Sequence, residues 1–213
     1  MSTSTRDRLV TATTELLRTR GYSATSVKQI TVAAGVPMGS LYHHFPGGKP
    51  ELAAIALRSA GVAYGRLIPL LLSPYPDLRD AVPAAFAAAA EQIEQTGWIN
   101  MCPVGTVAGE VADAEPALRE VLAEIIDEWI ADGTAYFVAR GLPEAAGREL
   151  ILAIVTALEG AFVLSRTLRS TEPLHTAGRA MSARLGELLA APEFDAAGAA
   201  DHREHPAQSD IRR

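Results

Sequence analysis

The sequence has little cysteine, few aromatic residues and no long uninterrupted apolar run. Cys102 is the single cysteine among 213 residues, and aromatic residues make up 6%. No disulfide can form within the chain, which excludes the class of small secreted proteins held together by disulfides. The N-terminal residues are polar and include Arg6 and Arg8, unlike a secretory signal. The most apolar run, residues 81–90, contains Pro83 and is too short to cross a bilayer, so we expect a cytoplasmic protein without a membrane partner.

Sequence signatures of common catalytic sites are also missing. The chain has no HExxH, CxxC, GxSxG or phosphate-loop pattern. Of the histidines outside the N-terminal part, His202 and His205 lie in the polar C-terminal stretch. Nothing therefore favours an enzyme, and we expect no cofactor and no metal ion. Catalysis by carboxylates alone is the alternative that the sequence leaves open.

The net charge of −6 argues against a nucleic-acid partner when it is taken for the whole chain. Its distribution changes this conclusion. Residues 1–58 carry seven basic and three acidic side chains, a charge of +4, so the remainder carries −10. This division predicts DNA contact through the first part only, and the acidic remainder argues against a nonspecific structural DNA binder. Chance scatter of a few charges is the alternative.

The chain is expected to be all-α, with about nine helices. Alanine supplies 39 residues, which favours helix, and no stretch keeps the alternating pattern of a half-buried strand. We predict a three-helix DNA-binding domain at 1–49, a helical domain at 50–191 and a disordered tail at 192–213. Glycine and proline breaks place the helices of the second domain near 50–73, 77–97, 104–113, 116–140, 143–170 and 172–191.

Residues 1–49 show the pattern of a helix-turn-helix unit. Apolar spacing predicts helices at 6–20 and 26–34, the second capped by Thr25 or Ser26. A turn at 35–37 leads into a third helix that buries Leu41 and Phe45. The start of this helix is slim and its exposed face is polar, as a helix that enters the major groove requires. The alternative is a packed three-helix cap with no role in DNA binding.

The run from Ser23 to Phe45, SATSVKQITVAAGVPMGSLYHHF, resembles the N-terminal domain of TetR-type transcriptional regulators. The segments FPGGK and CPVGTVA further resemble the LmrA/YxaF-like subgroup, whose members repress export and detoxification genes. The resemblance implies a repressor that binds a palindromic operator on double-stranded DNA as a dimer and is released by a small-molecule effector. It implies phosphate contacts from Thr25 or Ser26, Lys28, Tyr42, His43 and Lys49. Base-edge contacts would come from Met38, Gly39, Ser40 and His44.

The last two helices of the second domain are the predicted homodimer interface. The helix at 143–170 is apolar on almost all sides between Leu150 and Leu164, and the next one repeats apolar residues at 4-3-4-3 spacing. A two-fold arrangement of these helices would place two DNA-binding domains on one operator. The residues predicted for this interface are Ile154, Leu158, Ala161, Leu174, Gly178, Met181, Leu185 and Leu188. The alternative is that both helices only close a core within one chain.

A pocket for a largely apolar ligand is predicted where the helix near 77–97 ends and the chain becomes irregular. Aromatic side chains with a soft methionine and cysteine suit such a cavity, with Asn100, Glu110 or Glu159 as a polar anchor. The ligand-binding residues predicted are Phe86, Trp98, Met101, Cys102, Trp129, Phe137, Glu159 and Phe162. Two alternatives remain open, that the aromatic residues only fill the core and that Cys102 is a redox sensor.

Overall fold

A computed structural model describes residues 4–99, 101–111 and 114–190, and every regular element in these ranges is a helix. The all-α prediction is confirmed. The helices are α1 (Thr5–Arg20), α2 (Val27–Ala34), α3 (Met38–His44), α4 (Gly48–Gly65), α5 (Leu67–Leu72), α6 (Leu78–Gln95), α7 (Pro103–Val111), α8 (Pro116–Ala139), α9 (Glu144–Leu168) and α10 (Glu172–Ala190). The predicted tail at 192–213 lies outside the described residues.

The helix expected at 50–73 is divided into α4 and α5, which raises the number of helices in the described ranges to ten. Pro69 explains the division. It has no N–H to donate to the carbonyl of Gly65, so the hydrogen-bond ladder is interrupted between the two helices. The other predicted helices agree with the structure to within a few residues at each end.

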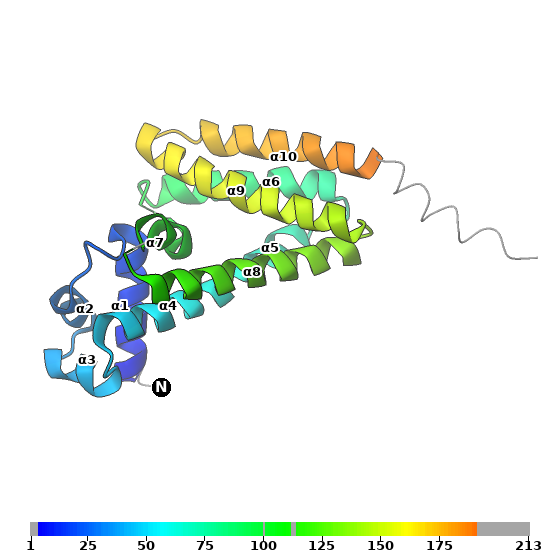
Figure 1. Cartoon of the computed structure of the whole chain (residues 1–213). Helices are drawn as coiled ribbons and strands as arrows, with labels where there is room; N and C mark the ends of the chain where they lie inside the picture. The colour runs from blue at the N-terminus through cyan, green and yellow to red at the C-terminus, as the bar shows by residue number, and fades with distance from the viewer. Residues whose placement is uncertain (1–3, 100, 112–113, 191–213) are drawn as a thin grey trace, which may run out of the picture.

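The helices form a small head and a larger body (Figure 1). The head consists of α1–α3 at one end of the molecule, and α4 runs from it beside α8. On the far side of the body, α6, α9 and α10 pack together. The short helix α7 lies between head and body and contacts α1, α4 and α8.

Local sequence signals explain the geometry of the head. Ser26 and Gln29 form a capping box at the start of α2, so Ser26 rather than Thr25 is the N-cap. Gly35 ends α2 in the left-handed conformation (φ 63°), which a residue with a side chain adopts only at a cost. The fully buried side chains of the head core are Leu9, Ile30, Leu41, Phe45 and Leu52. Since Leu52 belongs to α4, the head is completed by the first turns of that helix.

A second cluster of buried side chains joins the head to the body. It contains Leu17 of α1 and Tyr22 together with residues of α4, α7 and α8. The helices α4 and α8 approach closely at Gly61, where an added Cβ would lie 2.6 Å from Ile125. Here the indole N–H of Trp129 donates to the carbonyl of Gly61 at 2.7 Å. The head is therefore attached to the body through a continuous apolar core.

By length and composition alone, the stretches 48–72 and 144–168 are apolar enough to cross a membrane. The run at 81–90 considered in the sequence is thus not the most apolar helical stretch. Contacts within the chain cover only part of these stretches, where α4 packs on α1 and α8 and α9 packs on α6, α8 and α10. Of their most apolar parts, 28% is buried in the first and 22% in the second.

Candidate functional site

The exposed surface of α2 and α3 displays most of the residues predicted to contact DNA. Met38 and Tyr42 are each about half exposed, at 50% and 51% of their surface. Around Gly39 the surface is open, because an added Cβ would meet no atom within 4 Å. The other predicted residues on this surface, half-buried or exposed, are Ser26, Lys28, Ser40, His43 and His44. This helix end can approach a partner closely while hydroxyl, imidazole and ammonium groups flank it.

Thr25 does not belong to this surface. Its side chain is buried, and its hydroxyl donates to the carbonyl of Gly21 at 2.6 Å. A phosphate contact from this hydroxyl is therefore contradicted by its burial. Of the two residues that the sequence left as alternatives, only Ser26 is exposed.

Lys49, also predicted to contact phosphate, is engaged inside the chain. Its ammonium lies 3.8 Å from the centre of the Tyr22 ring, a cation–π geometry. Burial lowers the pKa of Lys49, and the nearby carboxylates of Glu115 and Glu110 partly offset this. A phosphate contact would require Lys49 to leave Tyr22. The sequence placed this lysine at a helix start but could not show that Tyr22 lies beneath it.

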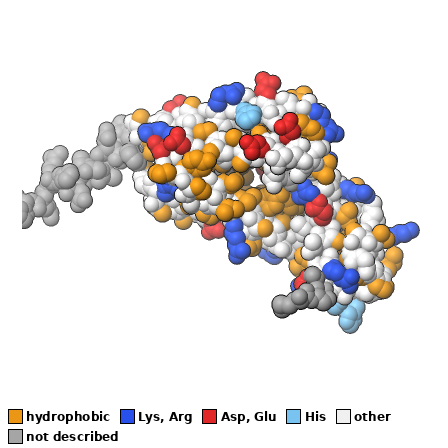
Figure 2. Space-filling view, turned by 180° about the vertical axis from the view of Figure 1, so that it is seen from behind, with side chains coloured by type: hydrophobic (Ala, Val, Ile, Leu, Met, Phe, Trp, Pro, Cys, Tyr) orange, Lys and Arg blue, Asp and Glu red, His pale blue; other side chains and the backbone are white. Residues whose placement is uncertain are grey.

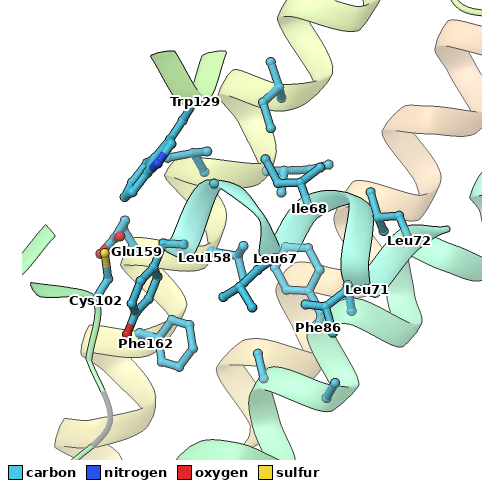
Figure 3. Close-up of a pocket in the computed structure, with 18 of the residues that line it drawn as sticks. Leu67, Ile68, Leu71, Leu72, Phe86, Cys102, Trp129, Leu158, Glu159 and Phe162 are labelled. Carbon is cyan, nitrogen blue, oxygen red and sulfur yellow. The ribbon is translucent and has the colours of Figure 1, made fainter. Parts of the chain in front are cut away.

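The body encloses a cavity of about 540 Å³. Helices α4, α5, α6, α8 and α9 supply its walls together with Met101 and Cys102, which directly precede α7. These walls are almost entirely apolar (Figure 3). Figure 2 shows apolar side chains around a hollow in the middle of the molecule. Seven of the eight residues predicted for the ligand site line the cavity, namely Phe86, Met101, Cys102, Trp129, Phe137, Glu159 and Phe162.

The remaining predicted residue, Trp98, is not among the residues that line the cavity. It packs against the core cluster of α6, α9 and α10 with a left-handed backbone (φ 67°). Residues that the sequence analysis missed include Tyr64 and the α5 residues Leu67, Ile68 and Leu71. The apolar run at 67–72 could have indicated the three α5 residues. However, this run faces the cavity only because the chain changes direction after α4.

Polar groups gather at one side of the cavity. The Glu159 carboxyl accepts a hydrogen bond from the Cys102 thiol, and burial raises its pKa. Burial also raises the pKa of Cys102, which keeps the thiol protonated and argues against a reactive redox cysteine. Tyr64 donates to the carbonyl of Met101 at 3.2 Å, and burial raises its pKa to about 12. Of the other two predicted polar anchors, Asn100 lies outside the described residues and Glu110 faces the head.

Helix α7 connects the cavity to the head. At its start, an added Cβ on Gly105 would lie 2.0 Å from a carboxylate oxygen of Glu159. At its other end, Glu110 accepts a hydrogen bond from the backbone N–H of Ser23 at 2.8 Å. The Glu110 carboxylate lies where a side chain at position 21 would be, so it keeps this place only while residue 21 has no side chain. The φ of 78° at Gly21 favours glycine as well. Beyond α7, the Tyr22 hydroxyl donates to Glu115 at 3.3 Å.

The residues predicted for the dimer interface face the interior of their own chain. Leu174 and Leu185 are fully buried, and an added Cβ on Gly178 would lie 2.8 Å from Phe86 of α6. Ile154 and Leu158 line the cavity. The other three, Ala161, Met181 and Leu188, also pack in this core. The structure therefore contradicts the prediction that these residues form an exposed interface. Helix α6 of the same chain occupies the position that the sequence analysis assigned to a second copy.

Comparisons with known proteins agree with this architecture. Residues 9–55 match the tetR family of bacterial regulatory proteins, and residues 79–180 match the C-terminal domain of LmrA/YxaF-like transcriptional regulators. The HTH-type regulator YxaF of Bacillus subtilis is 32% identical over 169 residues, which cover 79% of this chain and 88% of YxaF. The chain belongs to the TetR family of transcriptional regulators. LmrA of the same organism is 30% identical over 169 residues, covering 79% of this chain and 90% of LmrA.

The TetR-family fold extends over nearly the whole described chain. A TetR regulator of Chloroflexus aurantiacus superimposes with a TM-score of 0.70 at 29% identity, covering 85% of this chain and 94% of that chain. This TetR-family protein is therefore a DNA-binding transcriptional regulator with a helix-turn-helix head, and the alternative of a carboxylate enzyme is set aside.

Proposed function

We propose that this TetR-family protein is a repressor that binds a palindromic operator as a homodimer and releases it when a small, largely apolar molecule enters the cavity. The observation that carries the proposal is the cavity of about 540 Å³, whose lining residue Glu159 lies against Gly105 near the start of α7. The far end of the same helix holds the turn before α2 through Glu110 and Ser23.

In this proposal α3 reads the major groove. Gly39 and Ser40 allow the helix end to approach base edges, with His44 farther along, and the Met38 side chain can contact a thymine methyl. Phosphate contacts come from the exposed residues Ser26 and Lys28 at the start of α2 and from Tyr42 and His43 of α3. Lys49 joins them only if DNA binding frees it from Tyr22.

A second copy covers the outer face of α9. Only 22% of the most apolar part of this helix is buried within the chain. The large apolar residues that α9 leaves exposed are Leu152, Val163, Leu164 and Leu168. A two-fold contact over this face would bury them and present two heads to successive turns of the operator.

Release from DNA follows from the two contacts of α7. A ligand that displaces the start of α7 at Gly105 also displaces Glu110 and the turn that carries Ser23. The ligand lowers DNA affinity only to the extent that it binds the conformation that releases DNA more tightly than the conformation that binds DNA. Such coupling between two sites typically amounts to about 1–3 kcal/mol.

The test begins with selection of DNA from a random pool by the full chain, which yields the operator. Fluorescence anisotropy then compares Lys28→Ala with Arg148→Ala, which removes an exposed cation from the body. Only Lys28→Ala should weaken binding, and it should reduce the slope of log affinity against log salt by about one per head.

Two results would contradict the proposal. The first concerns DNA binding: selection from the random pool that enriches no palindrome, or equal effects of Lys28→Ala and Arg148→Ala on DNA affinity, would contradict it. The other concerns release. Apolar compounds that quench the fluorescence of Trp129 in the cavity should dissociate the operator complex, and bound compounds that leave DNA affinity unchanged would refute the effector role.

A further inference from the structure

We propose that the effector is a cation, a largely apolar molecule with one positively charged nitrogen that pairs with Glu159. This inference rests on the proposed function, in which the cavity binds the effector, and adds the chemical class of that effector. It is carried by the place of Glu159 in the cavity and by the side chains around it.

Among the described residues that line the cavity, Glu159 is the single one with a formal charge. Glu159 forms no salt bridge with any described arginine, lysine or histidine. The Cys102 thiol, a weak donor, is the hydrogen-bond partner that the structure gives it. A carboxylate removed from water without a cation or strong donors is unfavourable, and a cationic ligand would supply the missing charge.

The carboxyl group lies against α7 at Gly105. An added Cβ on Gly105 would lie 2.0 Å from it, so the carboxyl keeps this position only while residue 105 has no side chain and would otherwise have to move. Glu159 therefore sits at a defined place where α7 begins, which is also the end of the helix that a ligand must move to affect the head.

The cavity has one polar side and one apolar side (Figure 3). Glu159, Cys102 and Trp129 lie together at one side, and Leu71, Leu72 and Phe86 lie at the other. The ring of Trp129 lines the polar side, where an aromatic ring attracts a cation, and the apolar side suits a hydrocarbon or aromatic body. This arrangement fits an amphiphile with the charge at one end rather than a molecule that is apolar throughout.

The experiment uses two probes of the same shape with the full chain. One is a naphthylalkyl trimethylammonium ion, and the other is its neutral isostere with carbon in place of the quaternary nitrogen. Calorimetric titration at pH 7 should show the cation binding at least about tenfold more tightly. Glu159→Gln keeps the shape of the side chain and should abolish this preference. Gly105→Ala, which displaces the carboxyl without removing it, should reduce it.

The pH dependence provides a readout that a packing role would not change. Burial raises the pKa of Glu159, and a higher pH favours its ionised form, so the preference for the permanent cation should be larger at pH 8 than at pH 5. The other titratable groups beside it among the described residues are Cys102 and Tyr64, whose pKa values burial also raises, that of Tyr64 to about 12. Neither ionises in this range, and Arg18 beyond Tyr64 stays protonated.

The outcomes separate this inference from the proposed function. Equal or tighter binding of the neutral isostere, or a preference for the cation that persists in Glu159→Gln, would overturn the cationic assignment. If the neutral isostere also dissociates the operator complex, the cavity still binds the effector, but the effector is not required to be a cation. Absence of binding by both probes up to their solubility limits would count against both proposals. Thermal unfolding of each variant confirms that it is folded.

Discussion

Replacing Gly39 by alanine separates the role of α3 in reading DNA from its role in the fold. Gly39 is the second residue of α3 and is exposed, and an added Cβ would meet no atom within 4 Å. The new methyl group therefore disturbs no contact of the head. Alanine is favoured over glycine in a helix by at most about 1 kcal/mol, so the free energy of unfolding should stay equal or rise slightly.

The expected effect on DNA is the opposite. If α3 lies with this end against the base edges, the methyl group occupies space that a base or its bound water needs. The loss should be about 1–3 kcal/mol per head, the range of a mismatched base pair, which corresponds to about five- to 150-fold in affinity. Salt dependence should change little, because no phosphate contact is removed.

The assay compares operator affinity by fluorescence anisotropy with thermal unfolding of the same samples. The matched control is Gly109→Ala in α7, another exposed helical glycine with no atom within 4 Å of an added Cβ. It should gain the same stability and bind the operator as the wild type does. Unchanged operator affinity in Gly39→Ala would refute the close approach of α3 to the bases.

Two further predictions concern the body. Leu164→Glu places a charge on the exposed apolar face of α9 and should weaken dimerisation by about 2 kcal/mol or more in sedimentation experiments, with operator binding falling in parallel. Leu70→Glu, at a similarly exposed leucine of α5, should leave the dimer intact, and equal effects of both would refute an α9 interface. The raised pKa of Glu159 means that its contribution to stability is complete below the unfolded pKa of about 4.3 and is lost as the pH rises through the folded pKa. Unfolding of Glu159→Gln in urea should lack this pH-dependent loss, and identical pH profiles for variant and wild type would contradict the burial argument.

The parts of the fold that the sequence predicted well depend on neighbouring residues. The capping box of Ser26 and Gln29, the left-handed Gly35 and the helical spacing of Leu41 and Phe45 can all be recognised within a few positions. Local hydrogen bonds and backbone sterics decide these features, so no knowledge of distant contacts is required.

The predictions that the structure changed depend on which distant element covers a side chain. The spacing of Leu174 and Leu185 correctly indicated a buried seam on α10, but periodicity cannot distinguish α6 of the same chain from a second copy. Thr25 and Lys49 were assigned to DNA by type and position, and only the tertiary fold brings Gly21 and Tyr22 against them.

The cavity shows the same limit. Trp98 and Trp129 were both predicted to line it, and both are large aromatic residues of the body. Trp129 reaches the cavity because its indole is held by the carbonyl of Gly61 on α4, whereas the left-handed turn at the end of α6 directs Trp98 to the core. Composition indicated that a pocket exists, but the choice between these residues required the packing of α4 against α8.

The two ends of α7 have a consequence for how a cell would sense the effector. Equilibrium linkage requires that an effector that weakens operator binding by some factor is itself bound more weakly, by the same factor, to the operator complex. Copies on DNA would then respond only at a higher effector concentration than free copies. The free copies would bind the effector first, so the effector concentration needed for induction would rise with the cellular amount of the regulator. The nine-residue helix α7 between cavity and head would set how much the effector affinities of free and DNA-bound copies differ.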